Sequence, residues 1–272
     1  MTTHALNNHG VVTGMLETRF GPPPDHPTHS FVGPAGGPMQ RISHWDQHIL
    51  AFGLNDAGVV VGQAWKQEGT EVISHAFRWT GDTPALSPGA RESAAFHINA
   101  RGEIVGQRYI GDGSARAVKR GVGGRVQPLV PTMSSSYGAS LNHRGDVVGE
   151  VTVPGQGVKR AFVAWHNQPP LFIDRRDDPR ATSVALGVND RRQVVGKMTW
   201  APDHAEEPFY WDEQLAGPVK LMDLLDPDDP LRTRIVSLSS PLAINNAGQV
   251  LAHARDANGV VLPVLLTPLA GR

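Results

Sequence analysis

The sequence predicts an all-β protein, a six-bladed β-propeller, and three observations lead to that prediction. One ten-residue phrase recurs six times along the 272 residues, and each copy places two short apolar runs around a turn. No segment sustains the 3.6-residue spacing of an amphipathic helix. Four short strands per repeat of about 43–56 residues is typical of a propeller blade. We therefore expect a single β-propeller domain over residues 1–272.

The repeated phrase reads as a β-hairpin. Its six copies are ALNNHGVVTG, GLNDAGVVVG, HINARGEIVG, SLNHRGDVVG, GVNDRRQVVG and AINNAGQVLA, and they centre on Asn7, Asn55, Asn99, Asn142, Asn189 and Asn245. An Asn side chain hydrogen-bonds the backbone two residues on, and the glycine that follows takes positive φ without a Cβ clash. We expect the six asparagines to be structural turn caps. Arg192 replaces the glycine in the fifth copy, so that turn is expected to be strained or differently shaped.

Further apolar runs complete each blade. HAFRW at 75–79, RAFVAW at 160–165 and PFYW at 208–211 predict a third strand, and runs such as PVKLMDLL predict a weaker fourth. The last copy is followed only by VVLPVLLTPL and a few more residues, so its blade is expected to lack one outer strand.

These repeats resemble the HAF-repeat family of bacterial proteins, whose units are similar to an IN turn, a GxVVG strand and a HAFxW strand. The resemblance spans nearly the whole chain, and the HAF triplet itself stands at His75, Ala76 and Phe77. Proteins of that family are often exported repeats of undefined function. The resemblance therefore implies the fold and implies no particular activity.

Composition excludes several classes of function. The chain has 25 basic and 26 acidic residues, a formal charge of −1, so no overall field attracts nucleic acid or an anionic membrane. Cysteine is absent, which excludes disulfides and thiolate chemistry. The N-terminus shows neither the basic nor the apolar region of a signal peptide, and no segment supplies about 18 consecutive apolar residues. We expect a soluble, cytoplasmic, bacterial protein.

The stretch RISHWDQHIL, residues 41–50, has the densest group of protonatable side chains. His44, Asp46 and His48 alternate beside Trp45. In an extended chain the two histidines are ~13 Å apart, too far for one metal ion, and one helical turn brings only those two together. No metal is expected, although a metal site, an acid/base site and a solvated loop with Trp45 as a packing plug all stay open.

The first strand of each blade should line the central channel, so the residues leading into it face a candidate site. His48, Glu92, Ser135 and Thr182 each stand seven residues before their asparagine, with Tyr137 and Arg180 nearby. We expect His48 and Glu92 to be a catalytic pair that exchanges protons. The alternative is that these residues only tie loops together by hydrogen bonds.

A second set of polar residues follows the VVG strand. These residues stand at the same position of their repeats, but their side chains differ in charge and hydrogen-bonding groups. They are Gln63, Gln107, Glu150, Lys197 and His253. Polar variety at one repeated position suits recognition of a single asymmetric ligand, and solvated strand ends are the alternative. The expected substrate-binding residues are these five together with His44, Trp45, Tyr137 and Arg180.

Three classes of function remain. The leading hypothesis is an enzyme that binds a small organic molecule in the central pocket and catalyses a cofactor-independent isomerisation, cyclisation or lyase step, as in bacterial secondary metabolism. No P-loop, GxGxxG, GxSxG or HExxH motif is present, and no cofactor is expected. A lectin-like binder would repeat the same polar and aromatic residues in every unit, which the loops do not. A protein-interaction scaffold would expose an apolar or single-signed patch.

Overall fold

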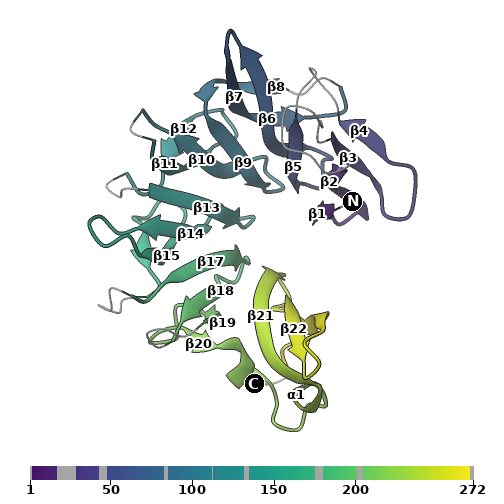
Figure 1. Ribbon diagram of the computed structural model, residues 1–272, viewed down its shortest axis with the longest axis vertical. Helices are drawn as coiled ribbons and strands as arrows, with labels where there is room; N and C mark the ends of the chain where they lie inside the picture. Colours follow the sequence, from purple (N-terminus) through teal and green to yellow (C-terminus); the bar gives the residue numbers. More distant parts are fainter. Residues whose placement is uncertain are drawn as a thin grey trace. The chain divides into compact units, whose positions relative to one another are not determined.

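The computed structural model describes residues 2–16, 29–42, 48–82, 85–111, 113–131, 135–174, 180–200 and 205–269. These residues form six antiparallel sheets, the blades of a six-bladed β-propeller (Figure 1). Within the described ranges the helical elements are a 3-10 turn, Leu221–Leu224, and the short helix α1, Leu231–Arg234. No helix there is long and apolar enough to cross a membrane. The predicted fold class is confirmed.

The chain divides into two compact units, and the first unit, residues 1–129, holds three blades. In each blade the strands pair in chain order as a meander. Blade 1 is β1 (Thr2–Leu6), β2 (Val11–Leu16), β3 (His29–Pro34) and β4 (Gln40–Ile42). Blade 2 is β5 (Ile49–Leu54), β6 (Val60–Glu68), β7 (Glu71–Trp79) and β8 (Ala85–Arg91). Blade 3 is β9 (Ser93–Ile98), β10 (Ile104–Tyr109), β11 (Ala115–Arg120) and β12 (Val126–Pro128).

The second unit, residues 130–272, holds the other three blades. Blade 4 is β13 (Ser135–Leu141), β14 (Val147–Thr152), β15 (Lys159–Ala164) and β16 (Leu171–Phe172). Blade 5 is β17 (Ser183–Val188), β18 (Val194–Thr199), β19 (Glu206–Trp211) and β20 (Val219–Lys220). Blade 6 is β21 (Ile235–Ile244), β22 (Val250–Asp256) and β23 (Val261–Leu266). The single domain over 1–272 stays a prediction.

Two expectations about outer strands can be compared with these bounds. Blade 6 has three strands, which agrees with the missing outer strand that the sequence predicts. In blade 5 the fourth strand predicted at PVKLMDLL is present but short, because only Val219–Lys220 pair with the sheet and the 3-10 turn follows directly.

The repeated asparagines do more than cap their turns. In the second blade the Asn55 side-chain oxygen accepts the Val59 N–H at 3.0 Å, and its Nδ2 donates to the Asn99 carbonyl of the next blade at 3.1 Å. The same link from Nδ2 to the next carbonyl joins Asn7 to Asn55, Asn142 to Asn189 and Asn189 to Asn245. Each unit therefore contains a line of such bonds, here called the asparagine ladder, which ties neighbouring blades together.

The turn at Arg192 is strained, as its sequence predicts. Its φ is 61°, in the left-handed region that the glycines occupy in the other copies. The guanidinium lies 4.7 Å above the Trp165 ring of blade 4 and donates to Glu213 at 3.1 Å. These contacts offset the backbone strain.

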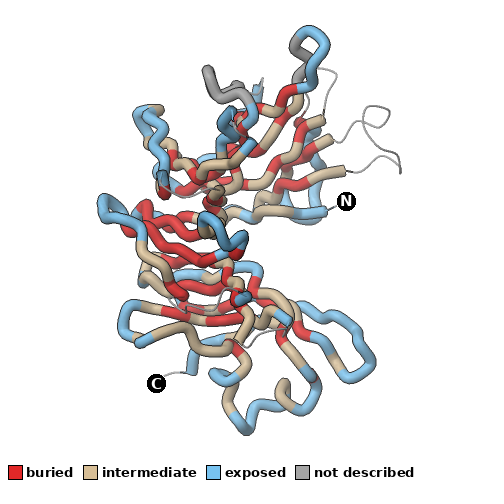
Figure 2. The backbone as a smooth tube through the Cα atoms, turned by 60° about the vertical axis from the view of Figure 1, so that its left-hand side comes forward, coloured by how far each residue is buried: buried red, intermediate tan, exposed pale blue. Residues whose placement is uncertain are grey.

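The glycine that ends each VVG run is required by a close approach between strands. A Cβ on Gly62 would lie 1.9 Å from the Leu50 carbonyl oxygen and 2.6 Å from the Phe77 ring, its cross-strand neighbour on β7. Gly149 has the same surroundings, with the Tyr137 oxygen at 1.9 Å and Phe162 at 2.9 Å. The phenylalanines that cover these glycines are fully buried. Figure 2 shows that the buried residues, in red, alternate with partly buried ones along the strands.

Every inner strand carries a β-bulge at one repeated position. The strand register shifts three residues before each asparagine, so that one residue is left without a partner in the ladder. The bulged residues are His4, Phe52, Phe96, Ala139, Leu186 and Leu242. In the first unit the bulged His4 and Phe52 rings stack, with centroids 5.6 Å apart, and the Phe52 and Phe96 rings lie at the same distance with their planes tilted by 50°. The bulge therefore places side chains of adjacent blades in contact.

Candidate functional site

The residues seven positions before the asparagines occupy equivalent places in their hairpins. The carbonyl oxygen of His48 accepts the Trp65 N–H at 3.0 Å, and that of Glu92 accepts the Tyr109 N–H at 2.7 Å. Thr182 makes the same bond, with Thr199 at 3.0 Å. These are the outermost backbone hydrogen bonds between the first and second strands of each blade. His48, Glu92 and Thr182 therefore each stand where the inner strand of their blade begins.

His48 lies in a group of side chains that the sequence did not bring together. Its ring meets the Trp65 ring edge-on, with centroids 6.3 Å apart and planes at 86°. His29, at the start of β3, accepts a hydrogen bond from Arg41 Nη2 on β4 at 2.8 Å. Burial lowers the pKa of His29, and the charges of Arg41 and His48 lower it further. We call His29, Arg41, His48 and Trp65 the His29 cluster.

Sequence reasoning did not single out His29, because it stands in the segment THSF, residues 28–31, which looks like an altered copy of the HAF triplet. A signal was available in principle, since a histidine that begins a third strand lies next to the residues that lead into the following inner strand. Sequence alone does not show that Arg41, twelve residues later, returns to the same place through the β3–β4 pairing.

The second predicted catalytic residue, Glu92, stands between β8 and β9. It is exposed, with a φ of 53°. Its pairing with His48 stays a prediction. His44 and Trp45 lie outside the described residues, so the interpretations of the 43–47 segment stay open. Within the described ranges no group of three or more His, Asp or Glu side chains is arranged to hold a metal ion.

The five polar residues after the VVG runs occupy the same rung of their sheets. Each lies opposite the residue five positions before its asparagine, as Gln63 does to Leu50 and Glu150 to Tyr137. Gln107, Lys197 and His253 have equivalent partners. The shared register is confirmed, and a role in ligand binding stays a prediction.

In blade 4 the residues at this position are Tyr137 and Glu150, two ionisable side chains on paired strands. Burial raises the pKa of Tyr137 to about 12, and the charge of Glu150 contributes to that shift. Glu150 also pairs with Lys159 at 2.7 Å. Tyr137 therefore stays protonated at neutral pH and can donate a hydrogen bond.

In blade 5 the equivalent rung is closed by an ion pair. Lys197 lies 3.4 Å from Glu206, which also accepts a hydrogen bond from Thr182 Oγ1 at 2.9 Å. At Thr182 the structure thus shows the loop-tying hydrogen bond of the alternative interpretation. Arg180, two residues earlier, is exposed.

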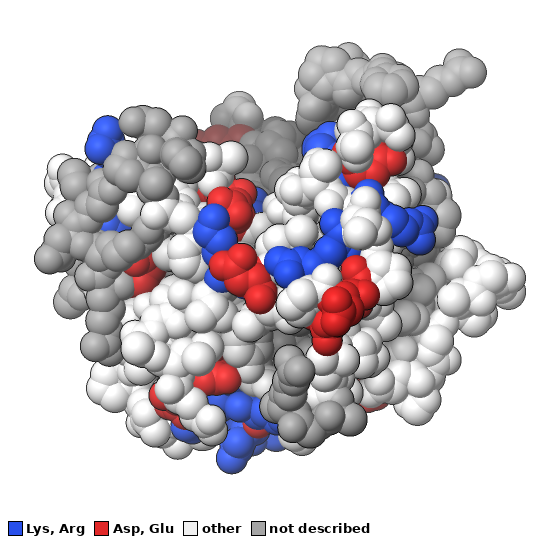
Figure 3. Space-filling view, turned by 90° about the horizontal axis from the view of Figure 1, so that it is seen from below, with Lys and Arg blue, Asp and Glu red and all other residues white. Residues whose placement is uncertain are grey.

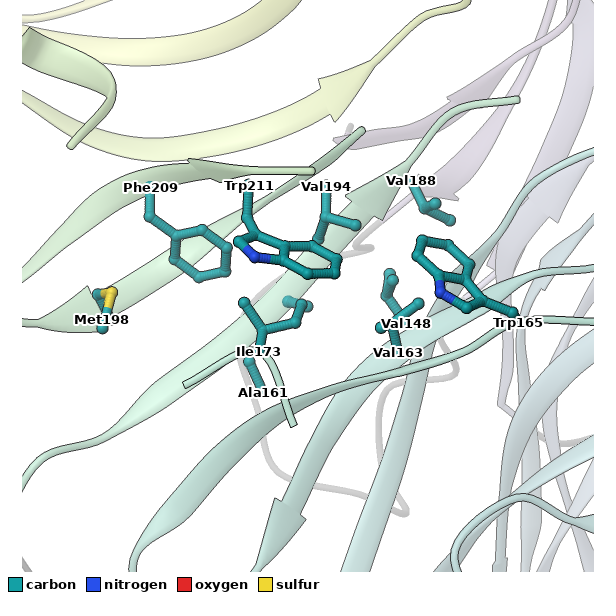
Figure 4. Close-up of a cluster of buried hydrophobic side chains, with 11 residues drawn as sticks. Val148, Ala161, Val163, Trp165, Ile173, Val188, Val194, Met198, Phe209 and Trp211 are labelled. Atoms are coloured by element: carbon teal, nitrogen blue, oxygen red, sulfur yellow. The ribbon is translucent and has the colours of Figure 1, made fainter. Parts of the chain in front are cut away.

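The second unit contains a pocket of about 700 Å³ that the sequence did not predict. It lies between the outer strand of blade 4 and the body of blade 5, and its lining includes Met198, Trp200, Trp211, Asp174 and Glu213. Figure 4 shows Ile173, another lining residue, directly beneath the Trp211 indole. The volume is typical of a small-molecule site. The pocket is built by residues from separate parts of the sequence, which explains why no motif marks it.

On the face that Figure 3 shows, basic and acidic side chains lie side by side, and no large region of a single charge stands out among the described residues. This agrees with the formal charge of −1.

No protein-family model matches the sequence, and no curated protein does. Among solved structures, an acylaminoacyl peptidase of Pyrococcus horikoshii is similar over 99% of this chain and 46% of the peptidase, with a TM-score of 0.57 and 10% identity. A putative gluconolactonase is similar over 95% of this chain and 85% of the gluconolactonase chain, with a TM-score of 0.44 and 8% identity. The chain thus spans less than half of the peptidase that it matches. The likeness to the peptidase shows the β-propeller fold alone.

Proposed function

We propose that this protein is a β-propeller enzyme that binds a small organic molecule and catalyses an isomerisation, cyclisation or lyase step by proton transfer, without a cofactor. The observation that carries the proposal is the His29 cluster, in which two imidazoles lie beside a guanidinium and an indole. Proton transfer between substrate carbons needs one group that accepts a proton and one that returns it.

His29 suits the part of the general base. Its lowered pKa leaves the imidazole neutral at neutral pH, with a lone pair on one ring nitrogen. In the free protein Arg41 donates to that ring. A carboxylate or carbonyl oxygen of a substrate that attracts the guanidinium would free the lone pair, so binding and activation of the base are coupled.

His48 suits the part of the second proton-transfer group, with the Trp65 ring as an apolar wall beside it. Glu92 remains a candidate partner for His48 at the equivalent position of the next blade. Gln63 and Gln107, the polar residues after the VVG runs of the same unit, would orient the substrate through their side-chain amides.

Hydrogen exchange with solvent tests this proposal without a known substrate. The protein is incubated in D₂O with a panel of 2-oxo acids and α,β-unsaturated acids, and mass spectrometry measures deuterium incorporation. We expect incorporation by the wild type that falls about 100-fold or more in His29→Ala and in His48→Ala. His143→Ala, at an exposed turn, is the control and should retain it. Glu92→Gln shows whether the carboxylate takes part.

Three outcomes would contradict the proposal. They are an absence of incorporation by the wild type across the panel, full incorporation by both histidine variants, and loss of incorporation when a chelator is added.

A protein-interaction role is the second candidate, and one observation favours it. The last strand of the three-stranded blade 6 exposes Val261 and Leu265, at 47% and 59%, and the neighbouring Leu251 on β22 is 39% exposed. Unpaired apolar edge strands bind other strands. Association of two copies through this edge predicts that the wild type sediments as a dimer and that Leu265→Lys sediments as a monomer. Leu224→Lys, at an equally exposed leucine elsewhere, should not change sedimentation.

A further inference from the structure

The bulged residues of the three inner strands in the first unit form a row of aromatic rings. They are His4 on β1, Phe52 on β5 and Phe96 on β9, and each is partly exposed. Neighbouring rings have their centroids 5.6 Å apart. Figure 1 shows that β1, β5 and β9 belong to successive blades of this unit. We call these three residues the aromatic row.

The repeat by itself does not account for the aromatic row. At the same bulged position the second unit has Ala139, Leu186 and Leu242, so the bulge forms with or without a ring. Phe52 and Phe96 nevertheless keep large apolar rings partly in contact with solvent. Contiguous apolar surface of this kind, unlike single exposed residues, is typical of a binding site.

His4 adds one hydrogen-bonding group to the row. Its Nδ1 lies 2.7 Å from the Ala51 carbonyl oxygen of the next blade, and a carbonyl oxygen can only accept, so Nδ1 carries the hydrogen. The lone pair of the neutral imidazole therefore stands on Nε2. This second nitrogen has no hydrogen-bond partner among the described residues, and it is not buried. One nitrogen thus fixes the ring, and the other is open to a ligand.

We propose that the aromatic row binds a flat aromatic ring that carries a hydrogen-bond donor, of the chemical class of a phenol. Such a ring can pack against the Phe52 and Phe96 rings in the offset or edge-to-face arrangements that aromatic pairs prefer. Its hydroxyl group can donate to the lone pair on His4 Nε2. A saturated alcohol would make the hydrogen bond without the ring contacts, and an aryl ether would make the ring contacts without the hydrogen bond.

This site is independent of the proposed proton-transfer chemistry. The aromatic row shares no residue with the His29 cluster, although both lie in the first unit. Its test measures binding and does not measure deuterium exchange. The two proposals can therefore fail separately.

The imidazole signals of the twelve histidines in a long-range ¹H–¹⁵N spectrum give the readout, because the Nε2 shift responds to a hydrogen bond that this atom accepts. The full chain is titrated separately with phenol, anisole, cyclohexanol and benzoate. His4→Phe assigns the His4 signals by their disappearance, and it keeps a ring beside Phe52 while removing the lone pair. His9→Phe, at the exposed turn of the same hairpin, is the matched control.

We expect phenol to shift the His4 Nε2 signal saturably and to bind about 3- to 10-fold more tightly than anisole or cyclohexanol. In His4→Phe the preference for phenol over anisole should disappear, as followed by the backbone amide signals of Phe52 and Phe96. His9→Phe should keep the preference. Phe52→Leu keeps an apolar side chain but loses the ring, so it should bind phenol no more tightly than cyclohexanol. If that variant does not fold, the comparison of phenol with cyclohexanol in the wild type tests the same contact.

Other outcomes would overturn the proposal. Equal affinities for phenol and anisole in the wild type would mean that His4 accepts no hydrogen bond from the ligand. Equal affinities for phenol and cyclohexanol would mean that the rings do not select an aromatic ligand. Tighter binding of benzoate than of phenol would mean that His4 acts as a cation. A His4 signal that responds to none of the four probes, or a His4→Phe variant that still prefers phenol, would also contradict it.

Discussion

At the scale of single residues, the repeated asparagine acts on two blades at once. Asn142 is buried, accepts the Asp146 N–H at 2.9 Å and donates to the Asn189 carbonyl of the next blade at 2.9 Å. The first bond shapes its own turn and the second holds the neighbouring turn. One side chain therefore links the local hairpin to the packing of blades within the unit.

Asn142→Ala is expected to lower the free energy of unfolding by about 2–4 kcal/mol, because the Asp146 N–H and the Asn189 carbonyl lose their partner in a buried place. Urea denaturation measures the change. Asn246→Ala is the matched control, since this side chain bonds Asp190 at the surface, and it should lose less than about 1 kcal/mol. Equal losses in the two variants would show that the asparagine ladder contributes no special stability.

Arg192 offers a separate test of backbone strain. Its φ of 61° costs about 1 kcal/mol for a residue with a Cβ and nothing for glycine. Arg192→Ala and Arg192→Gly both remove the contacts with Trp165 and Glu213, but only the alanine keeps the strain. We expect Arg192→Gly to unfold at a higher urea concentration than Arg192→Ala. The reverse order would mean that the turn is not strained.

Glu103 makes the fold sensitive to acid. Burial alone would raise the pKa of this carboxyl, but hydrogen bonds from Asn99, Lys119 and Arg101 outweigh it and hold the pKa at about 2, below the ordinary 4.5. A depressed pKa stabilises the folded state fully above pH 4.5, and that stabilisation is lost as the pH falls toward about 2. Glu103→Gln should be less stable than the wild type near neutral pH, and the difference should shrink across that window. A difference that stays constant with pH would contradict the assignment.

At the scale of strands, the VVG run and the third strand form one packing unit. The backbone of the inner strand and the Phe77 ring of β7 both approach Gly62 so closely that no side chain fits at this position. Sequence reasoning recognised both runs because they recur. It explained the turn glycines by positive φ but not the strand glycines, since their role depends on the neighbouring strand. The bulge in each inner strand was also missed, because its residue varies from histidine to alanine to leucine.

Gly62→Ala is expected to destabilise the first unit by about 3 kcal/mol or more, because the new methyl group would overlap the Leu50 oxygen and the Phe77 ring. Gly58→Ala is the control within the same hairpin. Its Cβ would meet nothing within 4 Å, so only its φ of 75° opposes the change, at about 1 kcal/mol. Thermal unfolding of both variants gives the comparison, and a smaller loss in Gly62→Ala than in Gly58→Ala would refute the packing explanation.

At the scale of the whole molecule, repetition decided what could be predicted. The six hairpins, the four-stranded blades and the short last blade follow from patterns that recur, and recurrence separates them from chance. A site is by nature unrepeated, so neither His29 nor the residues that line the pocket of the second unit carried a signal of that kind. His48 was found because it stands at a repeated position with an unusual side chain. The other members of the His29 cluster, Arg41 beside His29 and Trp65 beside His48, are brought there by strand pairing, which the sequence does not state.

The central claim is that repeated residues hold the blades while unrepeated ones carry the function. It is tested most directly by measuring the melting temperature and the deuterium exchange of Asn55→Ala and His48→Ala side by side. Asn55 is a buried member of the asparagine ladder, and His48 belongs to the His29 cluster of the same unit. We predict that Asn55→Ala melts several degrees lower and retains exchange per folded molecule, whereas His48→Ala melts within a few degrees of the wild type and loses exchange. An Asn55→Ala variant that loses exchange at an unchanged melting temperature, or a His48→Ala variant that unfolds early and keeps its exchange, would contradict the account.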